Sequence, residues 1–206
     1  MTKAEWKAEK LSVLGPDLGE YYCHLWEEMH AVRLWWHELT RIFGQGPEIV
    51  DLVNSVAPLY FNLMLGSQWR EVVLSICTFS DKATISGNST VSFKGLRKLV
   101  SDQLKQQELL DAIQRFEVTL IPIWLMRDKS VAHWDAEVVL GKVIPSVSID
   151  EVETSLKAAG EFMNVFERTF GLYRYDYTKV LDPIDGTTAM LMYLRAGKTA
   201  MEEGME

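Results

Sequence analysis

Residues 17–43 read DLGEYYCHLWEEMHAVRLWWHELTRIF, and this stretch decides the fold class. Its apolar and aromatic residues recur every three or four positions, which is the spacing of one face of an α-helix. They are Leu18, Tyr21, Tyr22, Leu25, Trp26, Met29, Val32, Trp36, Leu39 and Phe43. Two glycines and a proline in residues 44–47 then end the pattern. The stretch therefore predicts a long amphipathic helix that packs in a helical bundle.

Helical spacing also recurs along the rest of the chain. It predicts helices over 47–56, from Pro58 to about Ser80, over 105–126, from 149 to 170 and from 187 to about 196, with a short helix capped by Ser92. Pro122 should kink the helix over 105–126. Ser148 and Glu151 form a capping box at the start of the next long helix.

The segments between these helices are short or polar. Residues 80–91 are polar with a Gly-Asn turn and predict a loop, and residues 173–177 predict a short extended arm. We therefore expect an all-α fold, an up-down four-helix bundle with additional short helices. Residues 1–206 should form one domain, with a core over about 15–175 and a C-terminal arm and short helix over 176–206.

Composition limits the function classes. The chain has 206 residues, of which 48% are hydrophobic, enough for a sizeable core without disulfides or metals. Cys23 and Cys77 lie in apolar helical patterns and are expected to be buried free thiols. We find neither a signal-peptide pattern nor an apolar run long enough to cross a bilayer. No membrane association and a cytoplasmic location are the expectations.

The net charge of −8 argues against bulk coating of nucleic acid, because non-specific binding depends on phosphate neutralisation by Lys and Arg. Any RNA contact must therefore be local. Basic residues of the middle third are Lys94, Arg97, Lys98, Arg115, Arg127 and Lys129. They either form a basic patch or are solvated charges on helix surfaces.

The segment from Arg127 to His133 carries the candidate chemistry. Histidine titrates near neutral pH, so His133 can take a proton from a ribose 2′-hydroxyl or return one to the leaving oxygen. Arginine stays charged, and the fork of Arg127 can hold a phosphate oxyanion while charge builds in the transition state. These residue types suit RNA cleavage without a metal.

The run Arg127-Asp128-Lys129-Ser130-Val131-Ala132-His133-Trp134-Asp135 resembles the active-site motif of HEPN nucleases, an arginine, a polar residue and a histidine four to six positions on. It is most similar to the AbiU-type abortive-infection branch, whose motif reads Arg-Asn-Lys-x-x-Ala-His-x-Asp. Upstream, Trp69 to Asp81 and the loop that follows are similar to the same branch. The resemblance covers about residues 15–175.

This resemblance implies an RNA endonuclease of an abortive-infection or toxin–antitoxin system, with Arg127, Asp128 and His133 as catalytic residues. It implies a homodimer whose two motifs face each other, RNA as substrate, a cognate antitoxin as partner, and neither cofactor nor metal. The alternative is a non-catalytic helical dimer that acts as an interaction or antitoxin-like module. In that case Arg127, Asp128 and Asp135 form a salt-bridged helix end.

Two features of the motif depart from expectation. Asp128 stands where the branch has asparagine, and its carboxylate would neutralise Arg127 as well as orient it. On an ideal α-helix, six residues separate Arg127 and His133 by about 120°. The two side chains converge only if the helix ends, bends or meets a partner subunit.

A second motif points to different chemistry. Residues 181–188 resemble the metal-binding motif of inositol-monophosphatase-like phosphatases, in which Asp182 and Asp185 would hold magnesium. That family has strands before its motif and a large domain after it, and neither is predicted here. A turn followed by a threonine-capped helix is the simpler interpretation. A magnesium-dependent phosphatase is therefore the third hypothesis, and no metal ligand is assigned.

Overall fold

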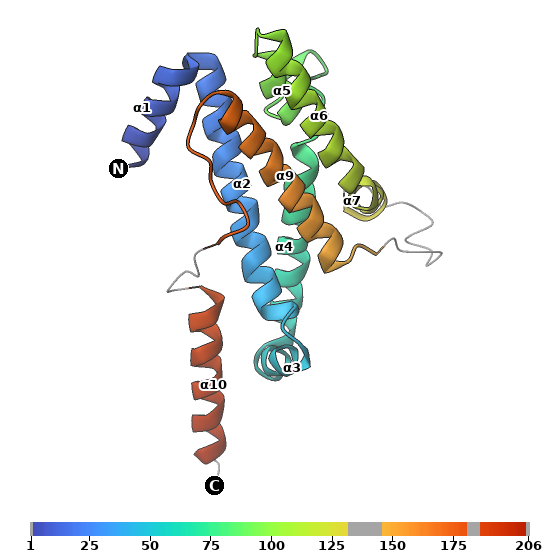
Figure 1. The fold of residues 1–206 in the computed structure, drawn as a ribbon. Helices are drawn as coiled ribbons and strands as arrows, with labels where there is room; N and C mark the ends of the chain where they lie inside the picture. The colour runs from blue at the N-terminus through green and yellow to red at the C-terminus, as the bar shows by residue number, and fades with distance from the viewer. Residues whose placement is uncertain (1, 132–145, 181–185, 205–206) are drawn as a thin grey trace. The chain divides into compact units, whose positions relative to one another are not determined.

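The computed structural model describes residues 2–131, 146–180 and 186–204, and these residues are almost entirely helical (Figure 1). The helices are α1 (Lys3–Leu14), α2 (Pro16–Phe43), α3 (Pro47–Val56), α4 (Pro58–Thr78), α5 (Phe93–Lys98), α6 (Gln103–Thr119), α7 (Ile121–Met126), the π-helix η1 (Arg127–Val131), α9 (Ile149–Thr169) and α10 (Thr187–Glu203). None of the described helices combines the length and the hydrophobicity needed to cross a bilayer.

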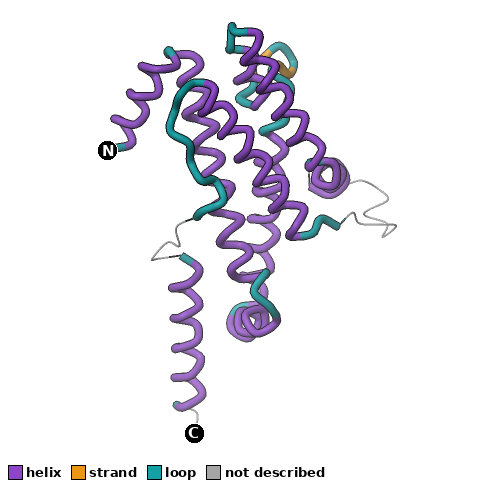
Figure 2. Tube along the Cα trace, in the orientation of Figure 1, coloured by secondary structure: helices purple, strands orange, loops and turns teal. Residues whose placement is uncertain are grey.

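The all-α prediction is confirmed. One difference lies in the polar segment 80–91, where β1 (Thr84–Ile85) and β2 (Asn88–Ser89) form a small antiparallel hairpin (Figure 2). Gly87 turns the hairpin with a φ of 85°, a backbone conformation that glycine adopts readily. A second difference is the last helix, which extends to Glu203 instead of ending near Ala196.

The predicted caps at Ser148 and Ser92 are also confirmed. The Ser148 side chain accepts the amide of Glu151 at 3.2 Å, and the Glu151 carboxylate accepts the amide of Ser148 at 2.7 Å. These two bonds satisfy amides that a helix start would otherwise leave unpaired. The Ser92 hydroxyl accepts the amide of Gly95 in the same way. Pro122 stands in the first turn of α7, where the chain leaves the axis of α6 (Figure 1).

The chain divides into two compact units. The first comprises Met1–Val32 and Val73–Thr178, and the second comprises Arg33–Val72 and Lys179–Glu206. The long helices α2 and α4 each contribute to both units. That residues 1–206 form one domain remains a prediction, as does the up-down order of the four-helix bundle.

Aromatic rings form the core of the first unit. The ring of Phe93 on α5 stacks on Phe162 of α9 with centroids 3.9 Å apart, and on Phe79 with centroids 5.1 Å apart. Phe116 of α6 packs against the same ring at 5.2 Å. All four residues are buried. Burial of such large apolar surfaces is the main force that holds α5, α6 and α9 together.

A buried carboxylate joins the arm 171–178 to this unit. Glu167 of α9 accepts hydrogen bonds from the hydroxyls of Tyr22 and Tyr177 and from the amide of Tyr175. Burial raises the pKa of the Glu167 carboxyl, and the hydrogen bonds from the tyrosines act in the opposite direction. Gly160 lets the arm approach α9, because a Cβ there would lie 2.7 Å from the Cβ of Tyr177. The predicted arm therefore packs on the bundle.

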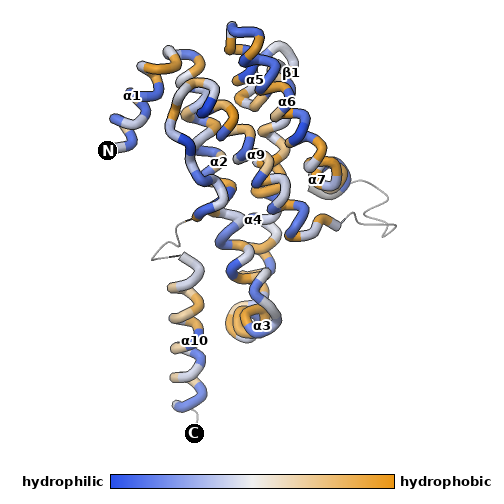
Figure 3. The backbone as a smooth tube through the Cα atoms, in the orientation of Figure 1, coloured by the Kyte–Doolittle hydropathy of each residue, from blue (hydrophilic) through white to orange (hydrophobic). Residues whose placement is uncertain are grey.

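The second unit has a smaller apolar core. Its buried residues are Ile42, Ile49, Leu52, Val53, Phe61 and Leu191. They come from α2, α3, α4 and α10. Figure 3 shows both hydrophobic and hydrophilic residues on α3, as expected for a helix that buries one face. The expected threonine cap of α10 is absent: the N-cap residue is Gly186, and the Glu38 carboxylate accepts the Thr187 amide at 2.6 Å. A carboxylate is stabilised at the start of a helix, because its negative charge interacts favourably with the positive end of the helix dipole.

Candidate functional site

The candidate site begins where α7 changes into η1. Arg127 ends α7, and its amide donates to the carbonyls of Ile123 and Trp124. Residues Arg127–Val131 then continue as a π-helix, a winding that is rare in proteins and often found at functional sites. Residues 127–131 therefore do not have the ideal α-helical geometry on which the offset of 120° was calculated.

Arg127 and Asp128 form a close ion pair. The Nε and Nη2 atoms of Arg127 both lie 2.8 Å from Oδ1 of Asp128. The Asp128 side chain is 58% exposed and the Arg127 side chain 29% exposed. Burial alone would lower the pKa of the Arg127 guanidinium, but the hydrogen bond to Asp128 and the nearby acidic groups raise it overall. Arg127 is therefore a permanent cation whose Nε edge contacts a carboxylate.

The C-terminal end of α4 and the residues after it lie beside Arg127. The Cys77 thiol is buried, and burial raises its pKa to about 12 while Arg127 acts to lower it. The Trp124 indole donates to the Ser80 hydroxyl at 3.2 Å, and that hydroxyl donates to the Cys77 carbonyl at 2.8 Å. The two parts of the sequence that carry the HEPN resemblance, Trp69 to Asp81 and the Arg127 segment, are thus joined by contacts in three dimensions.

Asp81 adds a second carboxylate near the guanidinium. Burial raises the pKa of Asp81, and the charges of Arg127 and Lys94 act to lower it. Lys94 of α5 forms an ion pair with Glu117 of α6. The described surroundings of Arg127 therefore include charges of both signs. The sequence resemblance included Asp81 but assigned no role to it, and Cys77 was expected only to be buried.

The other catalytic candidate, His133, lies outside the described residues, as do Trp134 and Asp135. The structure thus brings Arg127 and Asp128 together, while the convergence of Arg127 with His133 stays a prediction. Asp182 and Asp185 of the second motif also lie outside the described residues. Within the described ranges, no cluster of three histidine, cysteine or carboxylate side chains could hold a metal ion.

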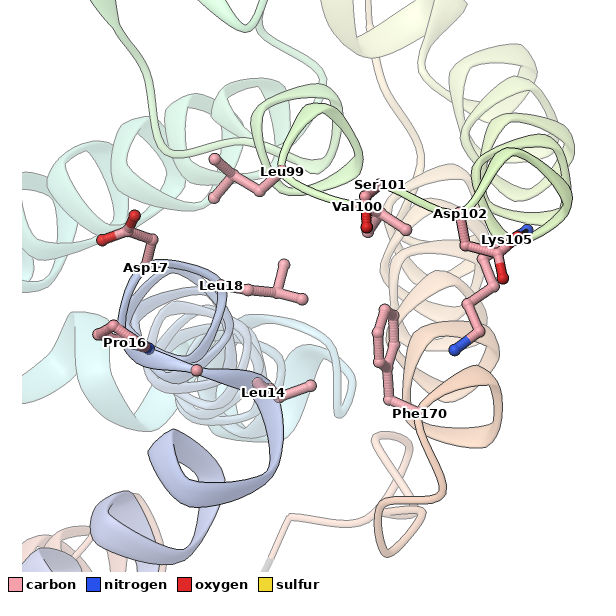
Figure 4. A pocket seen from close by; sticks show the side chains of 11 residues that line it. Leu14, Pro16, Asp17, Leu18, Leu99, Val100, Ser101, Asp102, Lys105 and Phe170 are labelled. Atoms are coloured by element: carbon pink, nitrogen blue, oxygen red, sulfur yellow. Dashed lines mark hydrogen bonds between the residues drawn. The ribbon is translucent and has the colours of Figure 1, made fainter.

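A hollow of about 390 Å³ opens elsewhere in the first unit (Figure 4). Leu14 and Leu18 line one wall, and Phe170 at the end of α9 lines another. Lys105 lies at its edge, with the ammonium group 4.6 Å from the centroid of the Phe170 ring. The described walls of this hollow include no residue of η1 or of the turn 79–81. We therefore do not assign it to the chemistry of Arg127.

Comparison with known families identifies the class of this helical chain as HEPN. The family model described as AbiU2 matches residues 15–184, which is most of the chain. The chain therefore belongs to the AbiU2 family of HEPN proteins. Comparison with curated proteins found no match, and comparison with solved structures found none either.

Proposed function

We propose that this chain is a metal-independent RNA endonuclease of an abortive-infection or toxin–antitoxin defence system. The observation that carries the proposal is Arg127, a partly exposed guanidinium on a π-helical turn, six positions before a histidine in a HEPN-family chain. The end of α4 and the turn after it support the proposal, because Cys77 and Asp81 lie near enough to Arg127 to raise the pKa of its guanidinium. RNA is the proposed substrate, and the cytoplasm is the proposed location.

The proposed reaction uses the 2′-hydroxyl of the RNA as nucleophile. His133 takes the proton of that hydroxyl while the 2′-oxygen forms a bond to the phosphorus. The bond from phosphorus to the 5′-oxygen breaks, and the leaving oxygen receives a proton from a histidine. Arg127 binds the non-bridging oxygens, whose negative charge increases in the transition state. The products are a 2′,3′-cyclic phosphate and a 5′-hydroxyl.

The direct test is incubation of the purified protein with RNA in the presence of EDTA. We expect cleavage fragments that carry 2′,3′-cyclic phosphate ends, because no metal-bound water takes part in the proposed step. The ends can be identified by mass spectrometry of the fragments. Intact RNA after incubation, with or without added divalent metal, would rule out the nuclease and favour an interaction module.

That interaction module is the second candidate, and one observation favours it. The Nε edge of Arg127 is already in contact with Asp128, so a salt-bridged helix end exists in the structure. In this case the protein binds its partner through the helical surface and does not cleave RNA. A cognate antitoxin is the proposed partner of the nuclease, whereas a toxin would be the partner of the module.

We also propose that the protein acts as a homodimer through the apolar stripe at the bend between α6 and α7. The stripe consists of Val118, Ile121 and Leu125, which are exposed by 68%, 62% and 50%. Ile121 and Leu125 are four positions apart in α7 and so lie on one face of that helix, and Val118 lies at the end of α6 just before the bend. Contiguous exposed apolar patches on a protein surface often mark protein–protein contacts.

Replacing Ile121 with lysine is therefore expected to convert a dimer into a monomer, because an ammonium group would be buried without a partner. Light scattering at matched protein concentrations measures the change. Val13→Lys is the control, since Val13 is a comparably exposed valine on α1 away from the stripe. A dimer that persists in Ile121→Lys would show that this stripe is not the interface.

A further inference from the structure

The arm 171–178 carries an aromatic side chain that the core of the first unit does not use. Tyrosines alternate along the arm: Tyr177 is buried, Tyr175 is half-buried, and Tyr173 is 72% exposed. Among the described residues, Tyr173 has a ring contact with Tyr175 alone, with centroids 5.2 Å apart and planes at 78°. An edge contact of this kind covers at most one face of a ring. Tyr173 therefore presents a free aromatic face to solvent.

The residue two positions after Tyr173 fixes the arm in place. The Trp6 indole donates to the Tyr175 hydroxyl at 2.8 Å, and the Tyr175 amide donates to the buried Glu167 carboxylate at 3.2 Å. The Tyr175 ring also meets Trp26 edge to face, with centroids 5.4 Å apart. These contacts come from α1, α9 and α2, and the arm runs beside the last two helices (Figure 2). A ligand at Tyr173 would therefore bind to a segment that is already ordered, which lowers the entropy cost of binding.

An open hollow of about 740 Å³ lies at the same place. Its volume falls within the range of about 300–1,000 Å³ that is usual for small-ligand sites. Asn164 of α9 is half-buried there, and its side-chain amide forms no hydrogen bond within the described part of the chain. Such an amide offers both a donor and an acceptor to a ligand. The described lining consists of Asn164, Leu172, Tyr173, Arg174, Tyr175 and Asp176.

The two charged side chains of this lining have opposite signs. Arg174 is exposed and forms no ion pair with the described residues. The Asp176 carboxylate accepts the amide and the hydroxyl of Thr178 at 3.1 Å and 2.6 Å, which ties it into its own turn. The hollow therefore does not attract an anion by net charge. It favours a ligand whose main contact is with the tyrosine ring and which carries one acidic group for Arg174.

We propose that the arm 171–178 binds single-stranded RNA, with one base stacked on Tyr173 and the adjoining phosphate on Arg174. Every nucleobase has a flat face, and unpaired bases can stack on aromatic side chains, whereas the bases of a duplex already stack on one another. A guanidinium matches phosphate oxygens with two parallel N–H donors. The amide of Asn164 supplies the hydrogen bonds that the edge of an unpaired base requires.

Stacking also suits the charge of the whole chain. With a net charge of −8, the protein cannot depend on broad phosphate neutralisation to bind RNA, so a local aromatic contact has to supply much of the affinity. The choice of RNA rests on the proposed function, while the place of binding rests on the arm itself. Tyr173 acts in binding and not in the chemical step, so its loss should raise KM and leave kcat similar.

Fluorescence anisotropy with a labelled single-stranded 2′-O-methyl RNA tests the proposal, because this probe lacks the 2′-hydroxyl that the proposed cleavage requires. We expect the single strand to bind about tenfold or more tightly than the same sequence in a duplex. Tyr173→Ala should weaken binding by about five- to hundredfold, the usual contribution of one stacked base. Tyr173→Phe keeps the ring and should bind within about twofold of the wild type. Arg174→Gln should reduce the slope of log affinity against log salt by about 0.7, which corresponds to one phosphate contact on a single strand.

Tyr193→Ala and Arg70→Gln are the matched controls. Tyr193 is 81% exposed on α10, Arg70 is exposed on α4, and neither lines the hollow. Both variants should bind the probe as the wild type does. Circular dichroism confirms that each variant is folded.

The outcomes separate this inference from the proposed nuclease. Binding of the probe through Tyr173 without cleavage of unmodified RNA would support the arm as an RNA site and remove the nuclease. Cleavage by a chain in which Tyr173→Ala binds the probe as tightly as Tyr193→Ala would overturn the inference and leave the nuclease. No binding of the single strand by the wild type would also overturn it. So would normal RNA binding by Tyr173→Ala together with a changed oligomeric state in light scattering, which would make the arm a protein contact.

Discussion

Replacement of His133 by alanine is expected to lower the rate of RNA cleavage by about 10²–10⁴-fold, the usual contribution of a general acid or base. The reason is that alanine can neither take the 2′-hydroxyl proton nor protonate the leaving oxygen. Single-turnover cleavage of a labelled RNA measures the rate. Expression in cells provides a second measurement, because the toxicity of the wild type should disappear with the same substitution.

His24→Ala is the matched control for this experiment. His24 is an exposed histidine on α2, so its replacement changes the histidine content without touching the Arg127 segment. Its cleavage rate and toxicity should equal those of the wild type. A His133→Ala protein that cleaves RNA as fast as His24→Ala would remove His133 from the proposed mechanism.

Helix periodicity predicted most of the fold because helices depend on local sequence. The pattern of residues 17–43, the proline in α7 and the capping box at Ser148 each set a helix or its boundary through neighbouring residues. The hairpin at residues 84–89 was missed because two-residue strands leave no alternating pattern. The cap of α10 was missed because Glu38, which accepts its first amide, lies 149 positions away.

In the candidate site too, contacts between neighbouring residues could be predicted, whereas contacts between residues far apart in the sequence could not. Asp128 was expected to pair with Arg127 because the two residues are adjacent, and the structure confirms the contact. The position of Cys77 and Asp81 beside Arg127 depends on how the end of α4 packs near η1. No spacing of residues in the sequence indicates that these side chains lie near Arg127. The π-helical winding was likewise unexpected, because the residues 127–131 carry no distinctive pattern for it.

The ion pair between Arg127 and Asp128 affects how the proposed nuclease would bind an RNA phosphate. Asp128 contacts the Nε and Nη2 atoms, one of the two edges through which arginine can bind phosphate with two parallel hydrogen bonds. Because the Asp128 side chain is 58% exposed, the pair is worth only about 0.2–1 kcal/mol. An RNA phosphate can therefore displace the carboxylate, but it must approach a negative charge to do so.

Two substitutions separate the charge of Asp128 from its role in orienting Arg127. Asp128→Asn keeps an oxygen that can accept from Nε, so RNA should bind about three- to tenfold more tightly while the cleavage rate stays similar. Asp128→Ala removes the acceptor, and a displaced guanidinium should lower the cleavage rate by up to about 10²-fold. Fluorescence anisotropy with a non-cleavable RNA measures affinity, and single-turnover cleavage measures the rate. If Asp128→Asn instead lost cleavage without binding more tightly, the charge itself would take part in the chemical step, and Asp128 could not be a group that phosphate displaces.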